Sequence, residues 1–347
     1  MSAPLTIALD AMGGDRAPKM VVAGANVARK RYPNLRFLLV GDEGRLQKLL
    51  SRFPRLARVS SVCPSESVVR PSERPSLALR RGQRSSMRLA IDAVGNGEAQ
   101  GVVSAGNTGA LMAMAKVVLK TLPGISRPAI ASLFPTRRGE TVMLDLGANV
   151  DCDAENLVQF ALMGEVFARS VLGVVKPTVG LLNVGIEEIK GNEAVKAANE
   201  LLRSGRMAIS FHGFVEGDDI ANGTVDVVVT DGFTGNIALK TTEGTARLYT
   251  EFLRATFRRS IFSKLGYWIA RPALRALRNR VDPRRYNGGM FLGLNGVAVK
   301  SHGGTDALGF ANAIGFAFDM VTQGFNDRVI AELNRWNANG PTKAAAL

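Results

Sequence analysis

Two glycine-rich polar loops are the parts of this sequence best suited to chemistry. One follows the first apolar run as Asp10-Ala-Met-Gly-Gly-Asp15, and the other follows a later run as Ser104-Ala-Gly-Asn-Thr108. Small residues let backbone N–H groups converge, and the start of a helix adds a partial positive charge. Both features favour an anion such as phosphate, although a tight turn with an Asn or Thr that caps the helix gives the same pattern.

Three further polar loops follow apolar runs of the same kind. They lie at Asp145–Asp151, Asn183–Glu193 and Asp231–Asn236. In open α/β sheets, ligands bind outside the carboxyl ends of the strands. We therefore expect all of these loops to gather at one edge of a sheet, where their polar side chains form a pocket for an inorganic anion.

The sequence contains no standard set of nucleophile and base. It has two histidines, His212 and His302, and it lacks a Gly-x-Ser-x-Gly elbow, a Walker phosphate loop and a Gly-x-Gly-x-x-Gly fingerprint. Its two cysteines, Cys63 and Cys152, form neither a disulfide framework nor a zinc-ligand pattern, and we interpret Cys152 as a packed thiol. Direct transfer by positioning and electrostatics therefore fits better than a covalent intermediate.

Lys190 is the cation that we expect in the site. It would meet a phosphate oxygen or a developing oxyanion, a role that requires its side chain to point into the pocket. It also follows Glu187 and Glu188, and an ion pair at the surface is the alternative interpretation. For His302, at the end of an apolar run, stabilisation of a turn and binding of a ligand are both open.

Short apolar runs and longer segments of helical spacing alternate along the chain and must position these loops. The alternation predicts an α/β fold, a Rossmann-like three-layer α/β/α sandwich with a mainly parallel sheet and helices on both faces. With 46% apolar and 21% charged residues, the 347-residue chain can build a large core. We expect a single α/β catalytic domain over residues 1–335 and a flexible tail over residues 336–347. The expected strands are Leu5–Leu9, Phe37–Val40, Gly101–Val103, Ala129–Phe134, Val142–Leu146, Thr178–Val184, Ala208–Phe211, Val225–Val229 and Gly296–Lys300.

A basic amphipathic segment interrupts the expected domain over residues 252–286. The formal net charge is +14, and ten basic residues against one acidic residue lie between Arg254 and Arg285. Apolar residues spaced by four predict an amphipathic helical hairpin that contacts an anionic membrane surface. Packing on the core with a solvated basic face is the alternative, and an acidic carrier protein could share the patch; no base-reading module favours nucleic acid. The expected membrane-contact residues are Phe257, Ile261, Phe262, Leu265, Trp268 and Ile269.

The N-terminus of the sequence and the length of its apolar runs predict in which compartment the protein lies. The N-terminus begins directly with an expected strand and lacks the basic start and long apolar stretch of a signal peptide. No run of 18 apolar residues occurs, so we expect no membrane-spanning helix. Together with the scarcity of cysteine, these features predict a reduced, cytoplasmic setting.

Six motifs, taken in order, resemble those of bacterial phosphate acyltransferases, the PlsX family. The match runs over about residues 5–330, so the resemblance covers nearly the whole sequence. One departure is the loop His212–Gly217, where many members carry Gly-Asn. The motifs are Ile7–Asp15, Val103–Leu111, Leu146–Cys152, Gly180–Gly185 with Ile189–Glu193, Asp231–Asn236 and Val299–Gly303.

The resemblance implies an enzyme that moves a fatty acyl group from acyl carrier protein to inorganic phosphate, giving an acyl phosphate and free carrier protein. It implies direct attack of phosphate on the thioester, with no cofactor and no metal ion. It also implies a cytoplasmic homodimer that attaches peripherally to the inner face of the cell membrane and supplies a glycerol-3-phosphate acyltransferase of phospholipid synthesis. The implied fold is that of isocitrate and isopropylmalate dehydrogenases and phosphate acetyltransferases.

Residue-by-residue matching to the family's motifs implies two catalytic residues, Lys190 and Asn236. Lys190 would hold phosphate or the oxyanion, and Asn236 would donate a hydrogen bond to the carbonyl oxygen. The residues implied to line the substrate pocket are Asp10, Gly13, Gly14, Asp15, Ser104, Gly106, Asn107, Thr108, Asn149, Asp231 and His302.

Two other functions are open on the sequence. A nicotinamide-dependent dehydrogenase could use a related fold, and it would show absorbance changes at nicotinamide wavelengths and a carboxylate cluster for a metal ion. A non-enzymatic membrane scaffold would bind liposomes yet release no thiol from acyl carrier protein.

Overall fold

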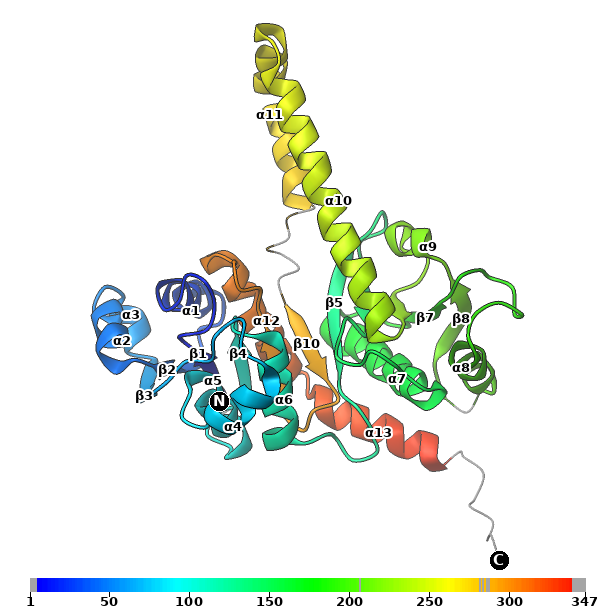
Figure 1. Ribbon diagram of the computed structural model, residues 1–347, viewed down its shortest axis with the longest axis horizontal. Helices are drawn as coiled ribbons and strands as arrows, with labels where there is room; N and C mark the ends of the chain where they lie inside the picture. The colour runs from blue at the N-terminus through cyan, green and yellow to red at the C-terminus, as the bar shows by residue number, and fades with distance from the viewer. Residues whose placement is uncertain (1–4, 206, 281, 283, 285–287, 339–347) are drawn as a thin grey trace, which may run out of the picture.

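The computed structural model describes residues 5–205, 207–280, 282, 284 and 288–338 of the chain (Figure 1). In this part of the chain, eleven strands form one sheet in the order β3-β2-β1-β4-β11-β10-β5-β6-β9-β7-β8. The fold is therefore mixed α/β with a large central sheet. The strands are β1 (Leu5–Asp10), β2 (Leu35–Gly41), β3 (Ser60–Pro64), β4 (Gly101–Ser104), β5 (Ala129–Pro135), β6 (Glu140–Leu144), β7 (Thr178–Leu182), β8 (Ser210–Val215), β9 (Val227–Val229), β10 (Gly289–Leu292) and β11 (Val297–Lys300).

Helices connect most of these strands. The helices are α1 (Lys19–Arg31), α2 (Glu43–Leu50), α3 (Pro54–Ala57), α4 (Pro75–Arg81), α5 (Ser86–Gly95), α6 (Thr108–Leu119), α7 (Ala154–Val171), α8 (Glu193–Arg203), α9 (Gly217–Asn222), α10 (Gly232–Arg258), α11 (Ile261–Arg280), α12 (Ala307–Thr322) and α13 (Phe325–Ala338).

Strand direction changes within the sheet. Seven of the ten pairings between described strands are parallel, so the sheet is mainly parallel, as the sequence predicts. The three antiparallel pairings join β11 to β10, β10 to β5 and β5 to β6. As a result, β6, β9, β7 and β8 run opposite to β1, β2, β4 and β11 within the hydrogen-bonded sheet.

Helices cover both faces of the sheet. In β1, Ile7 and Leu9 point into the larger core, which α1, α7 and α12 cover, whereas Ala8 faces a second core under α5 and α6. A third apolar cluster joins β6, β8 and β9 to α9 and to the first turns of α10. Burial on both faces explains why the strands are almost continuously apolar in the sequence.

Helix caps set where the polar loops end. Asp153 caps α7, Asn192 caps α8 and Asp231 caps α10, each with a side-chain oxygen that accepts a hydrogen bond from the N–H group three residues later. Each loop that follows β6, β7 or β9 therefore has one end on a strand and the other on a capped helix.

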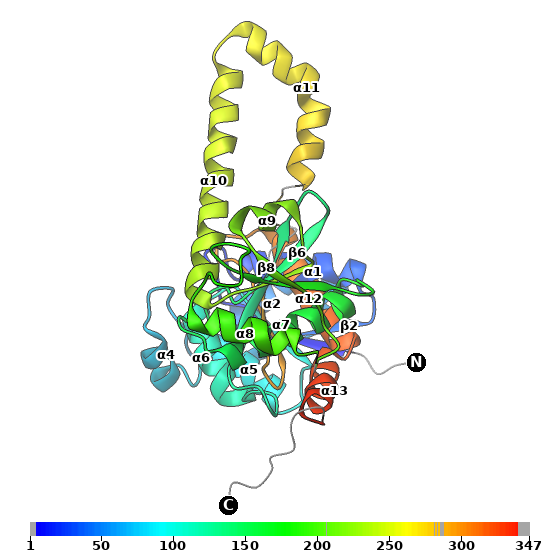
Figure 2. The ribbon, with the colours of Figure 1, turned by 90° about the vertical axis from the view of Figure 1, so that its right-hand side faces the viewer.

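Helix α10 extends away from the body of the molecule, and α11 runs back toward it (Figures 1 and 2). The sequence predicts that this hairpin starts at residue 252, but α10 begins at Gly232, because Asp231 caps it there. The two helices meet through Phe257 and Tyr267, whose rings lie 5.4 Å apart in an edge-to-face contact. Residues 281, 283 and 285–287 of the predicted segment lie outside the described residues.

The C-terminal helix α13 continues to Ala338, past residue 335, where the sequence predicts that the domain ends. Residues 339–347 of the predicted tail lie outside the described residues. In the part of the chain that the structure describes, no helix has both the length and the apolar content that crossing a bilayer requires.

Candidate active site

The polar loops after β1, β4 and β11, at residues 10–15, 104–108 and 301–304, form what we call the first loop group. Asp10 is buried in it, and its carboxylate accepts hydrogen bonds from Ser86 Oγ and Ser104 Oγ, both at 2.6 Å. Burial raises the pKa of Asp10, and the two serine hydroxyls oppose that rise. The hydrogen bond from Asp15 N to Gly303 O (3.0 Å) ties the β1 loop to the β11 loop.

Glycines let these loops approach one another closely. A Cβ at Gly13 would lie 2.4 Å from Asp10 Oδ2 and 2.8 Å from Gly106 N, so only glycine fits. Gly14 has a φ of +102°, which side chains rarely adopt. The structure thus brings together one part of the predicted substrate pocket, namely Asp10, Gly13, Gly14, Asp15, Ser104 and Gly106.

Two asparagines of the predicted pocket have structural partners for their side-chain amides. Asn107 caps α6 and donates to the carbonyl oxygen of Glu73 at 2.8 Å, which holds the loop before α4. Asn149 donates to the carbonyl oxygen of Pro128 at 2.8 Å and to Asp145 Oδ2 at 2.9 Å. Both amides therefore hold the loops in shape, a role that the sequence pattern does not distinguish from ligand binding.

Thr108 and His302 lie at the surface of the first loop group. Thr108 is the exposed first residue of α6. His302 is also exposed, and its Nδ1 accepts a hydrogen bond from Gly304 N at 3.1 Å, which stabilises the turn.

Burial raises the pKa of Cys152 to about 12, as expected for the packed thiol and not for a nucleophile. Among the described residues, no group of three or more His, Cys, Asp or Glu side chains is arranged to hold a metal ion.

The polar loops after β6, β7 and β9, at residues 145–151, 183–192 and 231–236, form the second loop group. Asp145 is buried and accepts hydrogen bonds from the N–H groups of Ile130 (2.9 Å), Ala148 (3.1 Å) and Asn149 (2.7 Å). Burial raises the pKa of Asp145 against these hydrogen bonds. The start of α10 packs directly on this loop, since a Cβ at Gly235 would lie 1.9 Å from Asp145 O.

Asp231 and Asn236 lie at the start of α10. The Asp231 carboxylate accepts hydrogen bonds from the N–H and hydroxyl groups of Thr234, both at 2.8 Å, and so acts as a helix cap. Asn236 is exposed, and its side-chain amide makes no hydrogen bond to a described residue. A Cβ at Gly147 would lie 3.5 Å from Asn236 Cβ, so Asn236 lies beside the Asp145 loop with its amide available to a ligand.

Lys190 lies in the second loop group, in the ion pair that the sequence offers as its alternative interpretation. Its Nζ is 2.9 Å from Glu187 Oε1, and its side chain is 46% exposed. Asn183 Nδ2 donates to the carbonyl oxygen of Lys190 at 3.1 Å and holds the loop in place. The side chain is thus at the surface and weakly held, because water screens an exposed pair of this kind.

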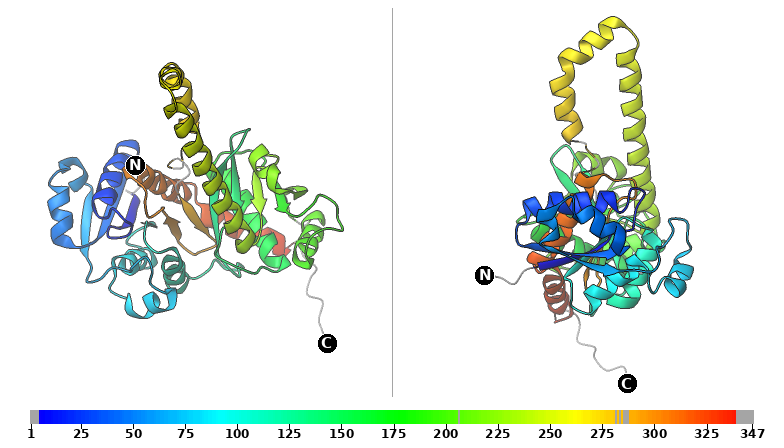
Figure 3. Two further views of the ribbon diagram at one scale, coloured as in Figure 1. Left: turned by 45° about the horizontal axis from the view of Figure 1, so that its top comes forward. Right: turned by 90° about the vertical axis from the view of Figure 1, so that its left-hand side faces the viewer.

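The two loop groups do not leave one edge of the sheet, and the sequence-based expectation is wrong on this point. The antiparallel pairings of β10 and β5 reverse the strand direction, so the two groups leave opposite edges. Five strand-to-strand steps separate β1 from β6, and at ~20–25° each the sheet twists by roughly 100–125° between them. A twist of this size would turn the second loop group toward the first, and the charge of Lys240 on α10 indeed acts on Lys300, at the end of β11. The right-hand view of Figure 3 shows β1 (dark blue) running from the N-terminal side toward the side on which α10 rises.

Lys300 is a functional candidate that the sequence-based reasoning did not select. It ends β11, its side chain is part-buried, and its Nζ donates to the carbonyl oxygen of Ser301. Burial lowers the pKa of Lys300 to about 8, and the negative charges of Asp10 and Asp15 oppose this fall. A lysine at the end of the otherwise apolar run Val297–Lys300 is the signal that could have found it.

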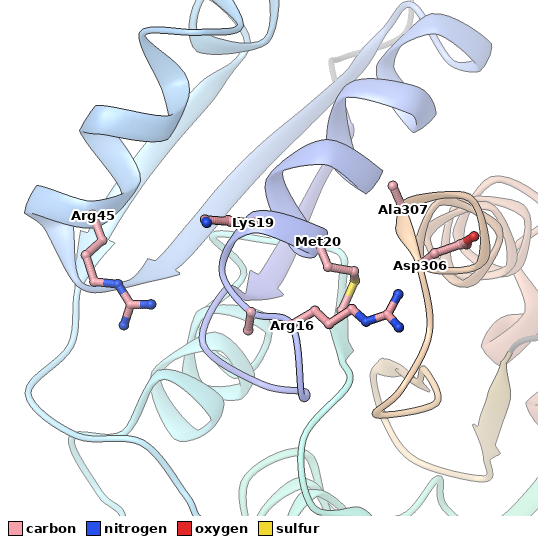
Figure 4. Close-up of a pocket in the computed structure, with 7 residues that line it drawn as sticks. Arg16, Lys19, Met20, Arg45, Asp306 and Ala307 are labelled. Carbon is pink, nitrogen blue, oxygen red and sulfur yellow. The ribbon is translucent and has the colours of Figure 1, made fainter.

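A hollow of about 610 Å³ lies beside the first loop group, between the starts of α1, α2 and α12 (Figure 4). The cationic side chains of Arg16, Lys19 and Arg45 line it, and none of the three makes an ion pair with a described residue. Asp306 also lines the hollow, but Arg284 pairs with it at 3.0 Å. The hollow is therefore positively charged and suits an acidic partner.

Comparison with known sequences finds similarity along nearly the whole chain. A family described as "FA_synthesis: Fatty acid synthesis protein" matches residues 5–328. A protein of Rhodospirillum centenum named phosphate acyltransferase is 65% identical over 347 residues, which cover 100% of this chain and 97% of that protein. A protein of the same name from Paramagnetospirillum magneticum is 61% identical over 335 residues, which cover 96% of this chain and 95% of that protein.

Comparison with solved structures finds the same architecture in phosphotransacetylases. A phosphotransacetylase from Streptococcus pyogenes is similar with a TM-score of 0.64 at 16% identity, over 93% of this chain and 95% of that chain. The EutD phosphotransacetylase from Staphylococcus aureus has a TM-score of 0.59 at 16% identity, over 92% of this chain and 94% of that chain. At these identities the similarity concerns the fold.

Proposed function

Because the chain belongs to the family of fatty acid synthesis proteins and is an enzyme that transfers acyl groups to phosphate, we propose that its acyl donor is an acyl carrier protein. The products are then an acyl phosphate and the free carrier thiol. Neither a nicotinamide-dependent dehydrogenase nor a non-enzymatic scaffold is retained, since the full-length relatives named above are phosphate acyltransferases.

The reaction needs positioning more than it needs a nucleophile on the protein. A phosphate oxygen attacks the thioester carbon and forms the new C–O bond. The C–S bond breaks, its electron pair leaves on sulfur, and the thiolate takes up a proton. Because a thioester carbonyl is already activated, the protein has to desolvate and orient phosphate and stabilise negative charge on the carbonyl oxygen.

Lys190 and Asn236 carry the catalytic roles in this proposal. Both lie in the second loop group, and the amide of Asn236 would donate a hydrogen bond to the thioester carbonyl oxygen. Lys190 would exchange its ion pair with Glu187 for an oxygen of the substrate, and breaking an exposed pair costs little. The other predicted residues of both loop groups would line the pocket or hold its walls.

The observation that carries the proposal is an apolar surface in the second loop group. Val184 is 77% exposed and Ile189 is 84% exposed on the loop that carries Lys190, and Phe233 is 60% exposed one turn before Asn236. Apolar side chains this exposed gain free energy when a ligand covers them. A fatty acyl chain would cover them and bring its thioester to the two catalytic residues.

The basic hollow supports an acidic protein as the donor. Arg16, Lys19 and Arg45 surround it beside the first loop group, and charges of this kind steer an acidic partner and orient it. A carrier protein seated there would extend its thioester arm along the surface toward the two loop groups.

We also propose that α10 and α11 attach the enzyme to the inner face of the cell membrane. Phe262 is 86% exposed and Trp268 is 70% exposed, among arginines that an anionic surface attracts. Phe257 packs on Tyr267 and would hold the helix pair together instead of entering the bilayer. The other predicted contact residues are exposed and complete this surface, namely Ile261, Leu265 and Ile269.

The proposal extends to the fold and the assembly. Helices on both faces of the sheet support a Rossmann-like three-layer sandwich, like that of isocitrate and isopropylmalate dehydrogenases, in one catalytic domain with the hairpin inserted. Exposed apolar residues on α10, such as Tyr249 and Phe252, support a homodimer. An acyl phosphate is a reactive mixed anhydride, which supports a downstream glycerol-3-phosphate acyltransferase that consumes it.

The test is phosphate-dependent release of the carrier thiol. Purified enzyme is mixed with acyl carrier protein bearing a fatty acyl thioester, and free thiol is followed with and without inorganic phosphate. We expect release that saturates with phosphate and yields one acyl phosphate for each thiol. Release that is independent of phosphate, or transfer only from a small-molecule thioester, contradicts the proposed donor.

A further inference from the structure

Lys300 lies next to the first loop group, within electrostatic range of the first half of α10. It ends β11 in register with Ser104 of β4, so its backbone is part of the strand edge that carries the first loop group. The charge of Lys240, two turns into α10, also acts on Lys300. Lys300 therefore interacts electrostatically with elements of both halves of the molecule.

The ammonium group of Lys300 makes no ion pair with a described residue. The carboxylates of Asp10 and Asp15 in the first loop group act on it through their charge, and both oxygens of Asp10 accept hydrogen bonds from the hydroxyls of Ser86 and Ser104. Lys240 pairs with Glu243 at 3.0 Å on its own helix. A part-buried amine that is mostly charged at neutral pH thus has one carbonyl oxygen as its partner and two further protons to donate.

An inorganic oxyanion satisfies this arrangement better than water does. It would accept the remaining protons of Lys300 and offset the repulsion that the charge of Lys240 exerts on this ammonium group. The α6 helix begins at Thr108 in the same loop group, and its N-terminal partial charge acts in the same direction. The unpaired ammonium of Lys300 and the start of α6 therefore favour negative charge at this point, against the carboxylates of Asp10 and Asp15.

We infer that Lys300 anchors the inorganic phosphate of the reaction through its ammonium group, which leaves Lys190 and Asn236 to act at the thioester carbonyl. This inference rests on the proposed function, because it assigns the phosphate of that reaction to a position. Lys300 would hold a phosphate oxygen by a charge-assisted hydrogen bond while another oxygen attacks the acyl carbon.

The experiment measures phosphate binding apart from catalysis. Inorganic phosphate is titrated into the wild-type enzyme and into Lys300→Met, Lys300→Arg and Lys190→Met without an acyl donor, by calorimetry. The KM values for phosphate and for the acyl carrier protein are then measured separately. Lys196→Met, at an exposed pair on α8, is the matched control. Should Lys300→Met not fold, Lys300→Gln takes its place.

We expect Lys300→Met to weaken phosphate binding at least ~10-fold, the scale of one hydrogen bond to a charged group, and to raise the KM for phosphate equally. The KM for the carrier protein stays unchanged, Lys300→Arg restores part of the affinity, and Lys190→Met lowers kcat with little effect on phosphate affinity. A merely structural role would not separate the two KM values.

Unchanged phosphate affinity in folded Lys300→Met overturns the inference, and so does a loss of affinity that occurs in Lys190→Met instead. A different set of results would show that the proposed function fails. In that case the wild type binds phosphate and Lys300→Met does not, but the wild type releases no carrier thiol. In that case Lys300 is still the anion anchor, and the acyl donor is wrong.

Discussion

The packing of α10 against the Asp145 loop predicts a large effect for one methyl group. Gly235 is buried in the first turn of α10, and a Cβ there would lie 1.9 Å from Asp145 O and 3.0 Å from Thr230 Cγ2. The neighbour at 1.9 Å is backbone and not the end of a flexible side chain, so the helix or the loop has to move. In Gly235→Ala, the start of α10 must therefore shift away from the second loop group.

The same helix provides the matched control. Gly244 lies further along α10, and a Cβ there meets nothing within 4 Å. Overpacking costs typically ~1–3 kcal/mol, and a clash with fixed backbone lies at the upper end. Replacing an exposed helical Gly with Ala gains up to ~1 kcal/mol. The free energies of unfolding of Gly235→Ala and Gly244→Ala should therefore differ by about 3–4 kcal/mol, with Gly244→Ala the more stable.

The assay combines urea unfolding with the phosphate-dependent thiol release. Because Asn236 follows Gly235 directly, a shift of the helix start also moves the amide that faces the carbonyl oxygen. A misplacement of this kind costs on the order of 100-fold in rate. We expect Gly235→Ala to lose both stability and turnover, and Gly244→Ala to keep wild-type turnover. Wild-type stability and turnover in Gly235→Ala would refute the tight contact between α10 and the Asp145 loop.

Four further predictions follow from the site and the surface. Lys190→Ala should lower turnover at least ~100-fold, the scale of one lost oxyanion donor, with little change in the free energy of unfolding because the Lys190 ion pair is exposed. Arg16→Glu combined with Arg45→Glu should raise the KM for the carrier protein, and leave the KM for phosphate unchanged, because the hollow would repel an acidic surface. Burial raises the pKa of Asp319 to about 6, above its unfolded value of about 4, so the folded chain holds this proton more tightly. The free energy of unfolding should then fall as the pH rises from about 4 to 6, and Asp319→Asn should flatten that fall. Flotation with anionic liposomes should be lost when polar residues replace Ile261, Leu265 and Trp268.

Each of these expectations has a contrary result. Near-normal turnover in folded Lys190→Ala removes Lys190 from the mechanism, and equal changes in both KM values remove the carrier protein from the basic hollow. Identical pH profiles of urea unfolding for the wild type and Asp319→Asn show that another group sets the acid limb. Unchanged flotation of the hairpin variant, with neutral liposomes as the reference, contradicts membrane contact through these side chains.

Most of the strands could be predicted from short apolar runs. The reversal of strand direction in the second half of the sheet could have been predicted as well. Only residues 136–139 separate β5 from β6, and only residues 293–296 separate β10 from β11. Parallel strands need a crossover of a dozen or more residues, so these short connections require antiparallel pairs. The strand β10 (Gly289–Leu292) was not predicted because it is short and follows the basic segment directly, so the connection between β5 and β6 is the part of the reversal that the predicted strands reveal.

In the candidate site, the sequence located the polar side chains, but it did not show which of them are free to bind a substrate. The motifs located Asn107, Asn149 and Asn236 in similar polar loops, and nothing in those loops distinguishes the three amides. In the structure, the partners of Asn107 and Asn149 include the carbonyl oxygens of Glu73 and Pro128, which come from other segments of the chain. The amide of Asn236 makes no hydrogen bond to a described residue, which is what makes it a candidate for substrate.

The sequence alone determined the features that depend on residues a few positions apart. The caps at Asp153, Asn192 and Asp231 are examples, because each hydrogen bond spans three residues. Only the tertiary structure decided which groups lose water and which charges face them. Lys300 acquires its lowered pKa from burial, among charges that lie far from it in the sequence and near it in space. Desolvation and Coulomb energies depend on distance through space, which follows from the pairing and twist of the strands and not from the order of residues along the chain.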